Sequence, residues 1–174
     1  DIFPLEIDKN NRTAWNYGMG GITSNTSFGY STYINNTVGF NNTLYGSYNL
    51  VNNTTGNNNN IYGTQNMPYS KNANNNFLFS IQGLFNNTSG DFNIGIGLQP
   101  LYNNIDGDGN IGIGNYSLFG NTSGNNKIGI GTLTLASNNG NGNIAIGNES
   151  SRHDTNGNNR VTIGNYSGKN LGSD

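Results

Sequence analysis

The stretch Asn93-Ile-Gly-Ile-Gly97 recurs down the chain at a nearly fixed interval. Its further copies are Asn110-Ile-Gly-Ile-Gly114, Lys127-Ile-Gly-Ile-Gly131, Asn143-Ile-Ala-Ile-Gly147 and Arg160-Val-Thr-Ile-Gly164. A short strand pattern that returns about every 17 residues, with no helical pattern between the copies, is typical of a chain wound into stacked coils. The sequence therefore predicts an all-β solenoid with little or no helix.

The repeat extends well beyond these five copies. We number its positions from 1 at the first residue of the pentapeptide to 17. Steps of one period back from Gly97 reach Ser80, Gly63, Gly46 and Gly29. This register predicts about nine coils over residues 25–167, preceded by a segment 1–24 and followed by a tail 168–174.

Alternation along the pentapeptide places positions 2 and 4 on one side of the strand and positions 3 and 5 on the other. Positions 2 and 4 are apolar in the later copies, so we expect them to face the core, while positions 9 and 10 supply the opposite wall of a coil with two short strands and two turns. The predicted core ladder consists of Phe28, Tyr45, Tyr62, Phe79, Ile96, Ile113, Ile130, Ile146 and Ile163 at position 4, and Leu50, Leu84, Leu101, Leu118 and Leu135 at position 9. Stacked asparagine amides are expected to hydrogen-bond along the pile.

The two halves of the repeat differ at position 3. The early copies have Leu44, Ile61 and Leu78 there, whereas the later ones have glycine or, at Ala145, alanine. The early coils are therefore expected to have an apolar outer side or a changed facing. Very small residues in the later coils allow another backbone to approach closely. Both features favour association with a second copy of the chain.

The ends of the repeat carry most of the charge. Arg152, His153, Asp154, Arg160 and Lys169 lie near the C-terminal end. Charged ends protect the open strand edges of a solenoid, so the ends are read as caps. The alternative is a joint between subunits, in which Ile2, Phe3 and Leu5 of segment 1–24 pack on the next copy.

The composition excludes several classes of partner. The formal charge is −2 and only 9% of the residues are charged, which argues against nucleic-acid binding by phosphate neutralisation. No apolar run approaches the roughly 20 residues that a membrane span needs. The chain has no cysteine, which excludes disulfides and thiolate metal sites and leaves the redox compartment open. Forty asparagines would indicate disorder, but their fixed positions in the repeat argue against it.

Catalytic chemistry is not indicated. His153 is the only histidine and the acidic residues are scattered, so we expect neither an enzyme nor a cofactor. A weak calcium candidate consists of Asp91, Asp106 and Asp108, because carboxylates in adjacent coils could ligate Ca²⁺. Polar turns without metal are the preferred interpretation.

Twelve asparagines begin an Asn-x-Ser/Thr acceptor sequence for N-glycosylation, and the sequence leaves open whether they carry sugars. They are Asn11, Asn25, Asn35, Asn41, Asn52, Asn53, Asn86, Asn87, Asn115, Asn121, Asn148 and Asn165.

The motif Asn143-Ile-Ala-Ile-Gly147 and its relatives resemble the repeats in head domains of YadA-type trimeric autotransporter adhesins. The whole unit 110–126 is still more similar to repeats in tail-fibre-like proteins of phages and large viruses. This resemblance implies a left-handed β-roll, side-by-side trimers, a location on a cell or virion surface and a role in attachment.

Three functions can be set against this pattern. The favoured one is a structural, self-assembling segment of an extracellular or viral fibre or filament, whose partners are further copies of itself and a cell-surface receptor or glycan. An ice-binding solenoid is the alternative, although Lys71 and Ile105 interrupt its threonine row at position 13. The third, a carbohydrate-acting enzyme, would need several acidic residues on one face. If the column from Phe28 to Phe79 were exposed, it would also be a candidate sugar-binding ladder.

Overall fold

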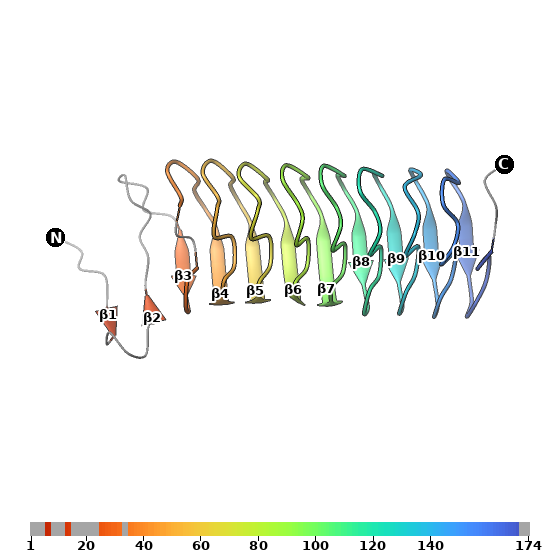
Figure 1. Cartoon of the computed structure of the whole chain (residues 1–174), viewed down its shortest axis with the longest axis horizontal. Coiled ribbons are helices and arrows are strands. Elements are labelled where there is room, and N and C mark those ends of the chain that lie inside the picture. Colours follow the sequence, from red (N-terminus) through yellow and green to blue (C-terminus); the bar gives the residue numbers. More distant parts are fainter. Residues whose placement is uncertain (1–5, 8–12, 15–24, 33–34, 171–174) are drawn as a thin grey trace.

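The computed structural model describes residues 6–7, 13–14, 25–32 and 35–170, and within these residues it is an all-β solenoid without helix. Nine parallel strands form one sheet in strict chain order, making about eight turns (Figure 1). Their bounds are β3 (Thr26–Phe28), β4 (Thr43–Ser47), β5 (Asn60–Thr64), β6 (Phe77–Ile81), β7 (Ile94–Leu98), β8 (Ile111–Ile113), β9 (Ile128–Ile130), β10 (Ile144–Ile146) and β11 (Val161–Ile163).

The predicted period of the stack is confirmed by the pairing of the strands. Ile96 pairs with Ile113, and Ile113 pairs with Ile130, so that paired strands lie ~17 residues apart. Between β9 and β10 the step is shorter by a single residue, since Ile130 pairs with Ile146. The chain therefore places each repeat position directly over its equivalent in the next coil.

The facing of the strands is the reverse of the prediction. Position 3 points into the core, where Leu44, Ile61 and Leu78 are fully buried, and Gly95 and Ala145 occupy the same place in later coils. The predicted core residues at position 4 lie on the outer side of the sheet, and this part of the prediction was wrong. The corrected set is Phe28, Tyr45, Tyr62, Phe79, Ile96, Ile113, Ile130, Ile146 and Ile163, all of which are exposed or half-buried. Alternation identifies two faces, but it does not say which one is inside.

The wall opposite the sheet is built from position 9. Leu50, Leu84, Leu101, Leu118 and Leu135 are buried there and form the core with the position 3 side chains. This wall contains no strand in the described coils, so the expected second strand of each coil was wrong. The reason is a recurring left-handed backbone: Leu50 has φ 50° and Leu118 has φ 54°. A leucine at positive φ turns the chain away from an extended path.

Two buried asparagine columns hold the turns of successive coils in register. At position 1, the side chain of Asn59 donates to Asn42 Oδ1 (3.0 Å) and to the Ala73 carbonyl (2.8 Å). Its own oxygen accepts the main-chain N–H of Asn76 (3.1 Å). At position 12, Asn121 donates to Asn104 Oδ1 (2.9 Å). Because buried amides need partners, these columns specify the stacking.

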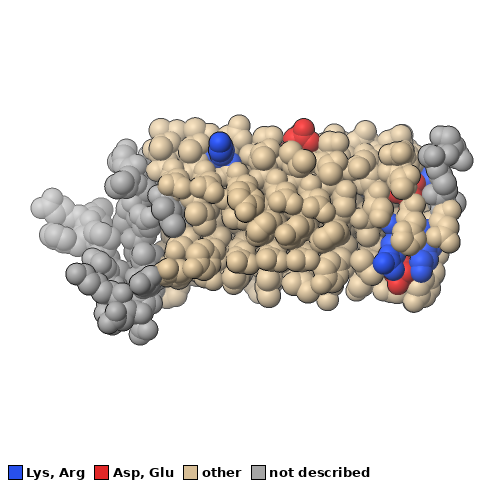
Figure 2. All heavy atoms as spheres, viewed as in Figure 1, with Lys and Arg blue, Asp and Glu red and all other residues tan. Residues whose placement is uncertain are grey.

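Charge gathers at the C-terminal end of the solenoid, as one face shows in Figure 2. Glu149 pairs with Arg152 (3.0 Å) and Lys169 (2.6 Å), and Arg160 pairs with Asp154 (2.9 Å). At the other end, β1 (Glu6–Ile7) and β2 (Thr13–Ala14) form an antiparallel pair. The proposed packing residues Ile2, Phe3 and Leu5 lie outside the described residues, as do residues 171–174 of the tail. No helix within the described ranges could cross a membrane.

Candidate functional site

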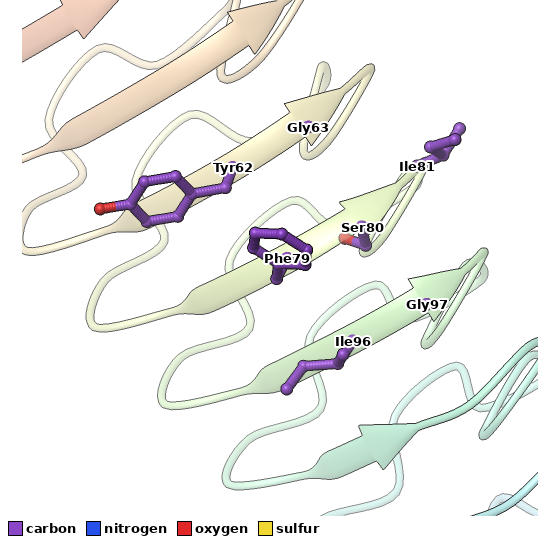
Figure 3. A pocket seen from close by; sticks show the side chains of 7 residues that line it. All are labelled: Tyr62, Gly63, Phe79, Ser80, Ile81, Ile96 and Gly97. Carbon is purple, nitrogen blue, oxygen red and sulfur yellow. The ribbon is translucent and has the colours of Figure 1, made fainter.

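The outer face of the nine-stranded sheet is the most unusual surface of the described chain. We define it by the side chains at positions 2 and 4 of β3–β11. Phe79 is 63% exposed, Val161 64% and Ile163 67%. Tyr62, Phe79 and Ile96 project from three neighbouring strands to the same side of the sheet (Figure 3). Apolar side chains thus stand in solvent along the length of the sheet.

No charged residue occupies positions 2 or 4 in any of the nine strands. Position 2 reads Thr, Thr, Asn, Phe, Ile, Ile, Ile, Ile and Val from Thr26 to Val161, and position 4 is aromatic or isoleucine throughout. Soluble proteins usually place polar side chains on a solvent-facing sheet surface. The outer face is therefore unusually apolar for a sheet surface that is exposed to solvent.

The exposed area of this face is large enough for a specific interface. With about 200 Å² per large side chain, the exposed fractions of both columns correspond to on the order of 1,000 Å². The largest apolar patch on a typical monomer is about 300–600 Å². A standard protein interface buries about 800 Å² on each partner.

A hollow of about 430 Å³ lies on the outer face over β5, β6 and β7 (Figure 3). It forms where the aromatic half of position 4 meets the isoleucine half, between Phe79 and Ile96. Its other lining residues are Tyr62, Gly63, Ser80, Ile81 and Gly97. The lining is almost entirely apolar, so the hollow suits an apolar side chain.

The aromatic column on the outer face is a stack of rings. Tyr45 and Tyr62 lie parallel, with their centroids 5.2 Å apart and an interplanar angle of 3°. A sugar ring stacks on the face of an aromatic ring, and in this pair each ring covers a face of the other. The exposure that the sugar-binding hypothesis required is present, but these two rings present mainly their edges.

The calcium candidates are partly engaged in turns. Asp91 Oδ1 accepts the main-chain N–H of Asn74 (2.6 Å), and Asp108 Oδ1 accepts that of Asp91 (2.7 Å). Asparagine accepts the same bond one coil further on, where the N–H of Asp108 donates to Asn125 Oδ1 (2.6 Å). Asp106 is exposed. In the described part of the chain, no group of three or more His, Cys, Asp or Glu side chains is arranged to hold a metal.

The glycosylation candidates fall into two groups. Asn25, Asn53, Asn87 and Asn121 belong to the buried columns, and their amides bond within the protein, which disfavours them as acceptors in the folded chain. The exposed or half-buried ones are Asn35, Asn41, Asn52, Asn86, Asn115, Asn148 and Asn165. Asn11 lies outside the described residues. Sequence alone misses this division, since both groups share one motif.

The threonine row at position 13 uses its hydroxyls internally. Thr37 donates to the Thr54 carbonyl (2.8 Å), Thr54 to the Lys71 carbonyl (3.0 Å) and Thr88 to the Ile105 carbonyl (3.0 Å). Each hydroxyl proton therefore bridges two coils. The threonine hydroxyls of this row are therefore less available to donate hydrogen bonds to water than the ice-binding hypothesis expects.

His153, the only histidine of the sequence, is exposed.

Comparison with family models, with curated proteins and with solved structures finds no match to this chain.

Proposed function

We propose that this chain is a structural, self-assembling β-solenoid segment of an extracellular or viral fibre or filament, and that it serves attachment to a surface or receptor. The observation that carries the proposal is the uncharged, apolar outer face, which follows the sheet from β3 to β11. Exposed apolar surfaces of this size mark sites of interaction with proteins, membranes or ligands.

A second copy of the chain is the occupant that best fits this face. Its side chains recur with the strand spacing of about 4.8 Å, over a length of about 38 Å. Another solenoid of the same period can place its own columns between these along the whole length. The hollow near Phe79 and Ile96 would then receive an apolar side chain of the neighbouring copy. Side-by-side association also leaves the turns in solvent.

The exposed turns would carry the attachment function. They contain asparagine, threonine and serine, such as Asn35, Thr88 and Ser123. Repeated polar groups on a stiff rod can bind a receptor or a glycan at many equivalent points, and such contacts gain avidity without strong single sites.

The experiment for self-association is sedimentation equilibrium of the purified chain and two variants. We expect the wild type to associate. The double variant Ile96→Lys, Ile130→Lys places like charges on facing copies and should be monomeric, with an unchanged circular dichroism spectrum. The control is Ile105→Lys, at a residue that is 45% exposed but lies at position 13, away from the outer face.

Two outcomes would reject this interface. One is a wild type that stays monomeric over the whole concentration range. The other is an Ile105→Lys variant that dissociates while the outer-face double variant remains associated.

A further inference from the structure

Lys127 interrupts the position 1 column of asparagines inside the solenoid. Its side chain is completely buried, and its main-chain N–H still donates to Asn110 Oδ1 (3.1 Å), as an asparagine would at this position. The Nζ atom lies 2.6 Å from Asn121 Oδ1, 2.6 Å from the Asn138 carbonyl oxygen and 3.3 Å from Asn138 Oδ1. A primary amine is therefore held beside a side-chain amide, away from water.

The position 12 column is altered at the same level. Asn53, Asn104 and Asn121 each donate to the amide oxygen of the preceding coil at 2.9–3.1 Å. Asn138 instead donates to the Gly157 carbonyl over 3.3 Å. Its Oδ1 accepts from the Asn143 side chain (3.0 Å) in addition to Lys127. The hydrogen bond from Asn143 remains on this oxygen when another group approaches the amide, and it polarises the amide carbon towards a nucleophile.

Asp154 occupies position 12 one coil beyond Asn138 and is also completely buried. Its Oδ1 accepts the Gly157 N–H (3.0 Å) and pairs with Arg160 (2.9 Å). Its Oδ2 is buried and has no hydrogen-bond partner among the described residues. A buried carboxylate oxygen with no partner is rare in proteins and calls for an explanation.

We propose that Lys127 and Asn138 form an intramolecular isopeptide bond, with the Asp154 carboxylate transferring the proton. The neutral Lys127 amine attacks Asn138 Cγ and a C–N bond forms. Asp154 Oδ2 takes a proton from the attacking nitrogen and delivers it to the amide nitrogen of Asn138. The bond from Cγ to that nitrogen breaks, and one ammonia leaves. The exchange needs no oxidant and no co-reactant.

The surroundings favour the nucleophile. Burial lowers the pKa of Lys127 to about 7, while the negative charge of Asp154 acts in the opposite direction. A substantial share of the side chain is then the neutral amine at neutral pH, which is the reactive form. Burial of Lys127, Asn138 and Asp154 also excludes water from the reaction.

Asn138 is the acceptor rather than Asn121 because of their different bonding. The amide nitrogen of Asn121 donates to Asn104 Oδ1 and to the Gly124 carbonyl oxygen, both at 2.9 Å. The nitrogen of Asn138 has one long bond, to the same Gly157 that donates its N–H to Asp154. Departure of ammonia from Asn138 therefore breaks fewer contacts.

The test is the intact mass of the full chain made in a host without N-glycosylation. The bond predicts a mass lower than the sequence mass by one ammonia. Digestion should yield a branched peptide joining Lys127 to Asn138, with no cleavage after Lys127. Succinimides at Asn-Gly pairs also lose ammonia, but hydroxylamine cleaves them and leaves an isopeptide intact.

Two variants use the residue that the repeat itself supplies at each position, which protects the fold. Lys127→Asn and Asp154→Asn should both show the full sequence mass. Full mass in the wild type would overturn the proposal, and so would a branched peptide that joins Lys127 to Asn121. An undiminished ammonia loss in Asp154→Asn would overturn the role of the carboxylate.

Discussion

The coils of β4–β6 and those of β7–β10 fill the core on the sheet side with different residues. In the first region, Leu44, Ile61 and Leu78 fill the core from the sheet side. In the second, position 3 is glycine or alanine, and neighbouring atoms lie close to the place of the missing side chain: a Cβ on Gly112 would lie 3.4 Å from Leu101 Cγ. The asparagine columns run through both regions, with Ser70 in place of asparagine at position 12 and Lys127 at position 1. The constant part of the coil is therefore its hydrogen-bonded turns, and the apolar strand residues are free to differ.

The largest effect is expected at position 5 of the first region. Gly63 has φ 127°, and a Cβ there would overlap the Ser80 carbonyl oxygen. Gly63→Ala should cost more than about 3 kcal/mol of unfolding free energy or prevent folding. Urea denaturation of the variant measures the loss.

The matched control for that glycine is Gly112→Ala in the second region. Its new Cβ meets only ordinary contacts, the nearest at 3.4 Å, so the change should stay within about 1 kcal/mol. Equal losses for both glycines would mean that position 5 is no more constrained than position 3.

Core truncation should separate position 3 from position 4. Ile61→Ala removes a fully buried side chain and should cost about 2–5 kcal/mol. Ile113→Ala removes a half-buried side chain from the outer face, so the monomer should lose about 1 kcal/mol or less. Guanidinium unfolding of both variants, at concentrations where the chain is monomeric, tests the facing. A larger loss for Ile113→Ala than for Ile61→Ala would mean that position 4, and not position 3, faces the core.

The asparagine columns should matter equally in both regions. Asn59→Ala and Asn110→Ala each remove a buried amide and leave its partners unsatisfied. Each should cost about 1–3 kcal/mol, and the two losses should be alike. Thermal denaturation of the pair measures this. A marked loss in one region alone would show that the columns do not act throughout the stack.

The smallest effect belongs to the charged C-terminal end. Hydrogen bonds from Lys169 and Arg152 hold the pKa of Glu149 below its ordinary value of 4.5. The unfolded chain then binds more protons than the folded chain as the pH falls through this region, so the stabilisation is present above about pH 4.5 and is lost below it. Glu149→Gln should unfold with a shallower acid dependence than the wild type in a pH titration of stability. If the stability of both proteins fell equally with decreasing pH, these ion pairs would not stabilise the fold.

The sequence predicts the stacking of the coils well, but it predicts poorly which face of the sheet points into the core. The period of the repeat, the strand positions and the buried leucines at position 9 follow from recurrence alone. The outer face was missed because apolar residues at positions 2 and 4 normally indicate a core. The sequence did contain an indication at position 3, because the large apolar residues Leu44, Ile61 and Leu78 favour a buried location there. The left-handed backbone at Leu50 and its equivalents could not be read, because leucine disfavours that conformation.

The buried charges near Lys127 also escape sequence reasoning. A lysine in place of an asparagine looks like an ordinary surface change. Only the stacking shows that position 1 faces inward and that its amine lies between two position 12 amides. The relation between positions 1 and 12 depends on the path of the turn, which the period does not specify.

The most direct test of the outer face uses single cysteines, because the chain has none of its own. Ala145→Cys reports the buried position 3, and Ile146→Cys reports the neighbouring position 4 on the outer side. The rate of reaction with a thiol reagent is measured for each under native conditions, from dilute to concentrated protein. We predict that Cys at 145 stays unreactive throughout, whereas Cys at 146 reacts in dilute solution and becomes protected as copies associate. A reactive 145 with a protected 146 in the dilute monomer would show that the sheet faces the other way.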